Sequence, residues 1–106
     1  MVEINWTDAA IQDLNDIGEY ISNDSPRYAE LTVFNLFSTP SILLHHPNAG
    51  KMVPEFALPA VRELISGNYR IVYRIVNDKR IDILTVHRCS RLIRNTIDFD
   101  DDDNSK

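Results

Sequence analysis

The spacing of apolar residues changes midway along this chain of 106 residues, and this change constrains the fold more than any other feature. Between residues 8 and 44 the apolar side chains recur every three or four positions, as on one face of a helix. Between residues 61 and 86 they alternate with polar ones, in runs rich in β-branched and aromatic residues. The sequence therefore predicts helices first and a sheet afterwards, which is an α+β fold.

Short signals mark where the elements begin and end. Thr7 and Ser25 are suitable N-cap residues, Pro26 suits a first helical turn, and Pro40 should interrupt the second helix. Because few residues separate them, the two helices are expected to form an antiparallel hairpin packed on a mainly antiparallel sheet. The expected elements are an edge strand at 2–6, helices at 8–22 and 26–44, a loop at 45–50, an irregular stretch at 51–59, strands at 61–65, 69–76 and 80–86, and a short helix at 88–97.

Strict alternation assigns the side chains of two strands to opposite faces of the sheet. In the first of these strands, one face receives Tyr69, Ile71, Tyr73 and Ile75, and the other receives Arg70, Val72, Arg74 and Val76. In the next strand, one face receives Ile81, Ile83, Thr85 and His87, and the other receives Asp82, Leu84, Val86 and Arg88. One face should cover the helices, whereas the other should expose some of Arg62, Arg70, Arg74, His87 and Arg91. The register between the strands stays open.

The charge changes sign along the chain. Residues 1–50 carry seven acids and one base, whereas residues 51–97 carry nine bases, seven of them arginine, and four acids. Arginine is suited to carboxylate or phosphate, so this asymmetry indicates an anionic partner; the alternative is that these bases pair with acids of the same fold. We expect one folded domain over residues 1–97, followed by an acidic, flexible tail at 98–106.

Several classes of protein are disfavoured. No apolar run approaches the roughly 20 residues of a membrane helix, and the start of the chain lacks the pattern of a secretory signal. The single cysteine, Cys89, cannot form an internal disulfide, which fits a cytoplasmic location. His45 and His46 are adjacent in a loop without a nearby cysteine, so we expect no metal, and the scattered glycines give no sign of a cofactor.

A few residues of the second half could cleave RNA through its 2′-hydroxyl. That reaction needs a base near neutral pH, a proton donor and cations for the pentavalent transition state. His87 could serve as the base, Arg70 and Arg91 could neutralise the phosphate, and Glu55 or Glu63 could be the second proton carrier. Structural roles are the alternative, with Arg70 paired to an acid on a neighbouring strand.

The order and spacing of several short motifs resemble the RelE/ParE superfamily of bacterial toxins from type II toxin–antitoxin modules. The resemblance covers residues 2–95. The matching motifs are Trp6-Thr7-Asp8-Ala9-Ala10 with Asp13-Leu14 and Tyr20-Ile21, Pro47-Asn48-Ala49-Gly50-Lys51, Val61-Arg62-Glu63-Leu64 followed by Tyr69-Arg70-Ile71-Val72-Tyr73, and Ile83-Leu84-Thr85-Val86-His87 with Arg91.

This resemblance implies a growth-inhibiting toxin that a cognate antitoxin holds inactive. In the RelE-like branch the toxin enters the ribosome and cuts mRNA without a metal, and Arg70, His87 and Arg91 would then be catalytic. In the ParE-like branch the toxin inhibits DNA gyrase. This sequence departs from the RelE-like pattern, because no tyrosine follows Tyr73 and no lysine cluster is present. The ending Val86-His87 with Arg91-Leu92-Ile93 is more similar to the ParE-like branch, which is therefore favoured. A family member that only binds its antitoxin is the third alternative.

The arginine-rich half is also the expected partner surface. The sheet face with its tyrosines, valines and arginines could be covered by an amphipathic or extended antitoxin segment. The residues expected to bind the partner are Lys51, Arg62, Arg74 and Arg88. Both a homodimer and a toxin–antitoxin hetero-oligomer are compatible with this resemblance.

Overall fold

The structure, a computed structural model, describes residues 2–89. Its elements are β1 (Glu3–Trp6), α1 (Asp8–Ser22), α2 (Pro26–Ser38), the 3₁₀-helix η1 (Thr39–Leu44), β2 (Lys51–Met52), β3 (Val61–Ser66), β4 (Tyr69–Asn77) and β5 (Arg80–Arg88). The prediction of a helix at 88–97 is wrong at its first residue, because Arg88 is the last residue of β5. The rest of that segment, Arg91 and the tail at 98–106 lie outside the described residues.

The helices begin and end where the capping signals predict. The Thr7 hydroxyl accepts a hydrogen bond from the Ala10 amide at 3.2 Å, and the Ser25 hydroxyl accepts one from the Tyr28 amide at 3.1 Å. At Pro40 the chain tightens into η1, since proline cannot donate to the preceding turn of an α-helix. Within residues 2–89, neither helix has the length and apolar character needed to span a bilayer.

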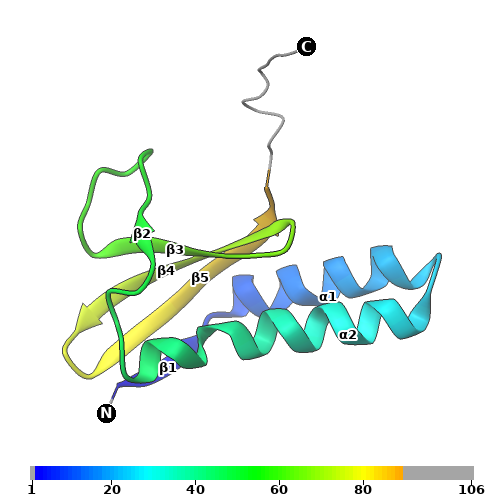
Figure 1. The fold of residues 1–106 in the computed structure, drawn as a ribbon, viewed down its shortest axis with the longest axis horizontal. Helices are drawn as coiled ribbons and strands as arrows, with labels where there is room; N and C mark the ends of the chain where they lie inside the picture. Colours follow the sequence, from blue (N-terminus) through cyan, green and yellow to red (C-terminus); the bar gives the residue numbers. More distant parts are fainter. Residues whose placement is uncertain (1, 90–106) are drawn as a thin grey trace.

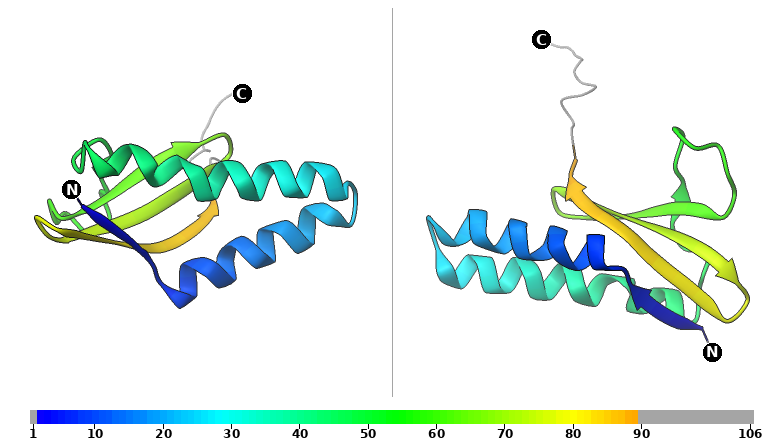
Figure 2. Two further views of the ribbon diagram at one scale, coloured as in Figure 1. Left: turned by 90° about the horizontal axis from the view of Figure 1, so that it is seen from below. Right: turned by 180° about the vertical axis from the view of Figure 1, so that it is seen from behind.

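The five strands form one sheet in the order β1-β5-β4-β3-β2. β1 pairs in parallel with β5, and every other pair is antiparallel. The helical hairpin lies along one face of the sheet and extends beyond its end (Figures 1 and 2). The predicted α+β fold is therefore confirmed. β2 was missed, because a two-residue strand beside two prolines reads as irregular chain.

The main core lies between the hairpin and the sheet. The helices and η1 contribute Ala10, Leu14, Leu36 and Leu43, and the strands contribute Ile71, Tyr73, Ile81, Ile83 and Val86. On β4 the alternation holds as predicted: the core side takes Ile71 and Tyr73, and Arg70 and Val72 lie on the other side.

A bulge at Leu84 overturns the predicted faces of β5. Tyr73 pairs with Ile83, but the next residue back along β4, Val72, pairs with Thr85, so Leu84 is an extra residue on β5. Beyond the bulge, Val86 therefore turns into the core with Ile83, and His87 turns to the opposite side. Strict alternation puts Val86 on the face opposite Ile83, because it cannot anticipate an inserted residue.

The face of the sheet away from the hairpin has a small core of its own. Val53, Val61 and Val72 are buried there, with Leu84 packed against them. Val53 follows β2, so the chain between β2 and β3 folds over this face and covers part of it (Figure 1). The remaining part is open and contains the charged residues Glu55, Arg70 and His87.

Candidate functional site

A cavity of about 320 Å³ opens on this second face of the sheet. It is lined by Val53, Glu55, Phe56, Arg70, Val72, Leu84, Thr85 and His87. Arg70 on β4 lies directly opposite His87 on β5. Because the bulge turns His87 to this face, it is the bulge that brings these two predicted catalytic residues together.

Arg70 is already paired with two carboxylates. Its Nη2 lies 2.5 Å from Glu63 Oε1, and its Nη1 lies 3.5 Å from Glu55 Oε2. Glu63 sits diagonally across the β3–β4 ladder and its side chain is only 8% exposed. Glu55 comes from the segment that covers the sheet, and its side chain is 63% exposed. The guanidinium is thus held from one side by a buried acid and from the other by an exposed one.

The buried pair is close but poorly aligned. Glu63 Oε1 and Arg70 Nε are both buried and have no hydrogen-bond partner among the described residues. The 2.5 Å contact from Arg70 to Glu63 is therefore an ion pair without hydrogen-bond geometry. Such a pair depends on charge attraction, so removal of either residue would leave a desolvated charge behind.

Glu55 is a poor proton donor at neutral pH. A hydrogen bond from its own backbone amide, followed by one from Arg70, holds the pKa of Glu55 below its usual range. Its carboxyl group is therefore ionised at pH 7. Around Arg70 the site has two negative charges against one positive charge, with His87 exposed at the rim.

Arg62, a predicted partner-binding residue, is occupied within the fold. It lies opposite Tyr73, on the same face as the core, and its guanidinium donates to the carbonyls of Gly50 at 2.8 Å and Pro59 at 3.0 Å. The buried Tyr73 hydroxyl accepts from the Gly50 amide at 3.0 Å and donates to the Pro47 carbonyl at 2.9 Å. Burial raises the pKa of this phenol. These bonds fix the loop before β2.

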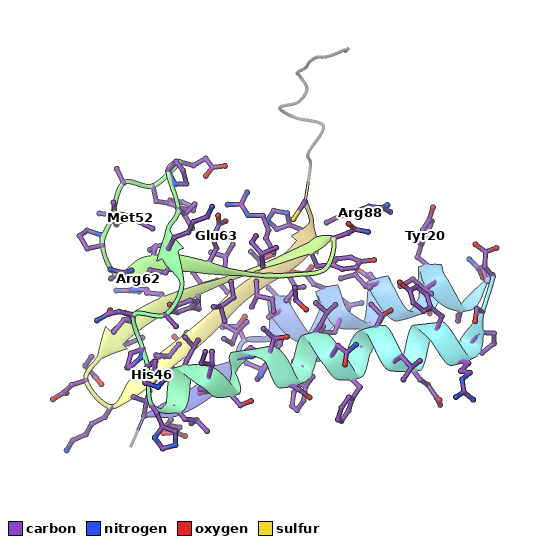
Figure 3. All side chains as sticks on the ribbon, in the orientation of Figure 1. Tyr20, His46, Met52, Arg62, Glu63 and Arg88 are labelled. Carbon is purple, nitrogen blue, oxygen red and sulfur yellow. The ribbon has the colours of Figure 1, made fainter. Side chains whose placement is uncertain are left out.

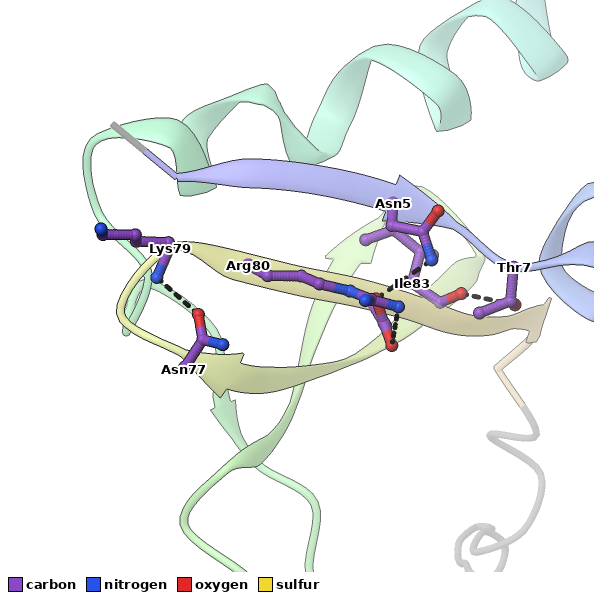
Figure 4. Close-up of polar contacts among 7 residues, drawn as sticks. Asn5, Thr7, Asn77, Lys79, Arg80 and Ile83 are labelled. Carbon is purple, nitrogen blue, oxygen red and sulfur yellow. Dashed lines mark hydrogen bonds and ion pairs between the residues drawn. The ribbon is translucent and has the colours of Figure 1, made fainter.

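Arg74 lies opposite Asp82, whose carboxylate accepts hydrogen bonds from the side chains of Arg80 and Asn5. Arg80 Nε donates to Asp82 Oδ1 at 2.8 Å, and the Asn5 amide donates to the same oxygen at 3.1 Å, which ties β1 to β5 (Figure 4). The hydrogen bond from Arg80 is the main reason why the pKa of Asp82 lies below its usual range. Arg74 itself is exposed.

The other two predicted partner-binding residues do not join the cavity. Arg88 lies opposite Tyr69, at the far end of the sheet from Arg62 (Figure 3). It lines another hollow beside α1 with Asp13, Asp16 and Tyr20, and His87 lines both this hollow and the cavity. Lys51 is exposed on β2. Among residues 2–89, the predicted cationic residues are therefore spread over both faces. The cavity brings together Arg70, His87 and Glu55, and Glu63 pairs with Arg70 beside it.

Sequence reasoning missed the role of Asp13. β1 ends opposite Ile83, so the outer edge of β5 beyond the bulge has no strand beside it. Asp13 of α1 covers this edge: its Oδ2 accepts from the Thr85 hydroxyl at 2.7 Å and from the Val86 amide at 2.9 Å. The sequence held one signal for this role: Asp13 lies next to Leu14 of the apolar stripe of α1. A carboxylate so close to a buried face needs a hydrogen-bond donor as its partner.

No group of three or more His, Cys, Asp or Glu side chains in residues 2–89 is arranged to hold a metal ion. The site on the second face is thus a cavity with apolar walls and an internally paired arginine at its floor.

The comparisons with known sequences agree with one another. The family model described as ParE toxin of type II toxin-antitoxin system, parDE, matches residues 4–93. Y4kP of Sinorhizobium fredii, whose name describes it as a toxin, is 34% identical over 85 residues, which are 78% of this chain and 83% of that protein. Toxin RelE2 of Caulobacter vibrioides is 27% identical over 92 residues, which are 87% of this chain and 100% of that protein.

Solved structures show the same fold. The chromosomal ParDE toxin–antitoxin system from P. aeruginosa contains a chain with a TM-score of 0.69 and 28% identity, covering 84% of this chain and 97% of that one. The RelBE2 toxin–antitoxin complex from Mycobacterium tuberculosis contains one with a TM-score of 0.54 and 24% identity, covering 82% and 96%. Since the family model spans most of the sequence, this chain belongs to the ParE toxins of type II toxin–antitoxin systems, within the RelE/ParE superfamily.

Proposed function

We propose that this protein is a toxin which a cognate antitoxin neutralises, and that it inhibits DNA gyrase by binding it rather than by cutting RNA. The observation that carries the choice of target is the pairing of Arg70 with Glu63 and Glu55. The family match and the ParDE and RelBE2 relatives support the antitoxin as a partner.

The pairing of Arg70 argues against RNA cleavage for an electrostatic reason. A cleaved phosphodiester develops negative charge, and a catalytic cation must be free to approach it. Here two carboxylates lie within 3.5 Å of the guanidinium, and a third negative group would be repelled by both. Binding to a protein target does not require a free cation. The apolar walls and polar rim of the cavity suit a protein interface.

RNA cleavage is the second candidate, and one observation favours it. Arg70 and His87 lie opposite each other beside an open cavity, so a cation and a base share one site. The exposed Glu55 is the weaker of the two acid partners of Arg70, and an incoming phosphate could displace it. The proposed experiment therefore measures both activities.

The test induces the chain in growing bacteria and follows plasmid supercoiling and mRNA integrity separately. We expect growth arrest, relaxed plasmid and intact mRNA, and we expect the same from His87→Ala, since the side chain of His87 is exposed and forms no hydrogen bond with any side chain of residues 2–89. Co-expression of the reading frame beside the toxin gene should restore growth.

Two results would contradict the proposal. Codon-aligned mRNA cuts that disappear in His87→Ala would assign the protein to the RNA-cleaving branch. Unchanged growth, with the folded chain present in the cells, would mean that it only binds its antitoxin. Tyr28→Ala, an exposed change on α2 away from the cavity, is the matched control for expression.

A further inference from the structure

The chain between β2 and β3 forms a projection on the side of the sheet away from the hairpin (Figures 1 and 2). We call residues 54–59 the β2–β3 arm; they are Pro54, Glu55, Phe56, Ala57, Leu58 and Pro59. All six are exposed, whereas Val53, the residue before them, is buried in the small core of the second face. The arm is therefore anchored at its base and open to solvent along its length.

Large apolar side chains of the arm lie in water. Phe56 is 55% exposed and Leu58 is 53% exposed, and Met52, shortly before the arm, is 46% exposed. Apolar side chains gathered in this way on a surface mark a binding site. Phe56 also lines the cavity around Arg70, so the arm continues the surface whose apolar walls suit a protein target.

Backbone hydrogen bonds hold the arm in one conformation. The Val53 carbonyl accepts from the amides of Phe56 and Ala57, both at 3.2 Å. The Leu58 carbonyl accepts from the Val61 amide at 3.0 Å. Ala57 has a φ of 50°, in the left-handed region that residues other than glycine seldom adopt. A segment fixed in this way loses little conformational entropy when its apolar side chains bind a partner.

The charge beside the arm is positive. Lys51 on β2 and Arg74 on β4 are exposed and form no ion pair with any of the described residues. Arg74 lies opposite the residue at which β3 begins after the arm. The nearby acids Glu55 and Glu63 are both paired with Arg70. A partner with an apolar pocket and acidic residues at its rim would match this surface, whereas a basic partner would be repelled.

We propose that the β2–β3 arm binds the protein target of the toxin, with Phe56 and Leu58 inserted into an apolar pocket that has an acidic rim. The inference rests on the proposed function, because it assumes a protein target, and it deepens that function by naming the residues that contact the target. A second copy of the chain is a poorer occupant. Its acidic hairpin could accept the arm, but this heterologous contact would join the copies into rings or filaments.

The first test measures growth arrest after induction of the full chain and inhibition of supercoiling by purified DNA gyrase. Phe56→Ser and Leu58→Ser should each raise the concentration for half-inhibition at least about tenfold, and should weaken growth arrest. Leu31→Ser is the matched control, because Leu31 is 50% exposed on α2, outside the arm, and we expect it to act like the wild type. Circular dichroism and urea unfolding verify that each variant is folded.

A second pair of variants tests the conformation of the arm while Phe56 and Leu58 stay in place. Ala57→Gly should inhibit as the wild type does, because glycine readily adopts a positive φ. Ala57→Val should be at least about tenfold weaker, because a β-branched residue does not tolerate a φ of 50°. Lys51→Gln combined with Arg74→Gln should also weaken inhibition and should reduce its dependence on salt concentration.

Four results would overturn the inference. They are full activity of both Phe56→Ser and Leu58→Ser, an equal loss in Leu31→Ser, loss of antitoxin binding in Phe56→Ser, which would assign the arm to the antitoxin, and self-association of the chain that Phe56→Ser abolishes. Failure of the proposed function gives a different result. If the wild type arrests growth without inhibiting gyrase, the proposed target is wrong, and loss of growth arrest in the two arm variants still supports the arm as the binding element.

Discussion

At the scale of single residues, Gly50 is the glycine with the least space for a side chain. A Cβ built on it would lie 2.5 Å from the Glu63 carbonyl oxygen and 2.7 Å from the Tyr73 ring and hydroxyl. Real Cβ atoms do not approach backbone this closely, so a methyl group here must displace β3 or the ring that fixes the loop.

We therefore predict that Gly50→Ala lowers the free energy of unfolding by about 3 kcal/mol, at the upper end of overpacking costs. Gly18→Ala should cost clearly less, because its Cβ would meet only the end of the Val33 side chain at 3.1 Å. Urea unfolding of both variants measures the two losses of stability. Equal losses would show that the loop before β2 can move to make room for the added methyl group.

The two acids around Arg70 should differ in their effect on stability. Glu63→Ala removes the buried partner, and we expect a loss of about 2–3 kcal/mol, below the cost for a fully buried pair because Arg70 keeps Glu55 and some solvent. Glu55→Ala removes an exposed partner and should cost less than about 1 kcal/mol. Chemical denaturation of the two variants measures their free energies of unfolding. A larger loss for Glu55→Ala than for Glu63→Ala would mean that the buried pair of Arg70 and Glu63 contributes nothing to stability.

Asp13 should stabilise the end of β5. Asp13→Ala leaves the Val86 amide and the Thr85 hydroxyl without their acceptor, at a cost of about 1–3 kcal/mol. Asp16→Ala is the matched control, since Asp16 is exposed and accepts only from Gln12 on the surface. Amide hydrogen exchange at Val86 should accelerate in the first variant alone, and unchanged exchange would refute the assigned role.

At the scale of elements, the junction of β1 and β5 predicts a pH dependence. The pKa of Asp82 is lowered from its ordinary value of 3.8, chiefly by Arg80. A lowered folded-state pKa means that Asp82 adds stability above about pH 4, and that this contribution disappears as the pH falls through the folded value.

The matching variant is Asp82→Asn. It should be less stable than the wild type at pH 7, and the difference should shrink as the pH falls below 3.8. Thermal unfolding followed by circular dichroism across this range is the measurement. A difference that stays constant down to the acid end would mean that the charge of Asp82 does not hold β1 to β5.

Most elements could be predicted from local signals. Capping by Thr7 and Ser25, the interruption at Pro40 and the alternation along 69–76 depend on neighbouring residues in the chain, and all of these predictions are confirmed. β2 was not predictable, because a two-residue strand exists only through its pairing with Arg62 and Glu63 of β3.

The candidate site was harder to predict, because it depends on register. The bulge at Leu84 decides which face His87 occupies, and alternation alone cannot show an inserted residue. The pairing of Arg70 with Glu63 needs the β3–β4 register, and Glu55 reaches Arg70 from a segment that reads as irregular. The residue types therefore suggested RNA cleavage, whereas tertiary contacts determine whether Arg70 is free to contact a phosphate.

At the scale of the whole molecule, two surfaces of different character lie on opposite sides. The hairpin carries six acids, one base and an apolar hollow between α1 and α2 that is lined in part by Val33, Phe34 and Phe37. The second face of the sheet carries the cavity around Arg70. We expect Phe34→Ser on the hairpin to leave gyrase inhibition unchanged, because Phe34 does not line the cavity around Arg70. A loss of inhibition in this variant would mean that the hairpin belongs to the surface that binds gyrase.

The most direct test of the proposed target uses purified components. The chain, with His87→Ala and Glu55→Ala as variants, is added to DNA gyrase with relaxed plasmid, and in parallel to translating ribosomes with a defined mRNA. The account predicts that all three proteins block supercoiling and that the mRNA stays intact. Full supercoiling in the presence of the wild type, together with mRNA cleavage that His87→Ala abolishes, would contradict it.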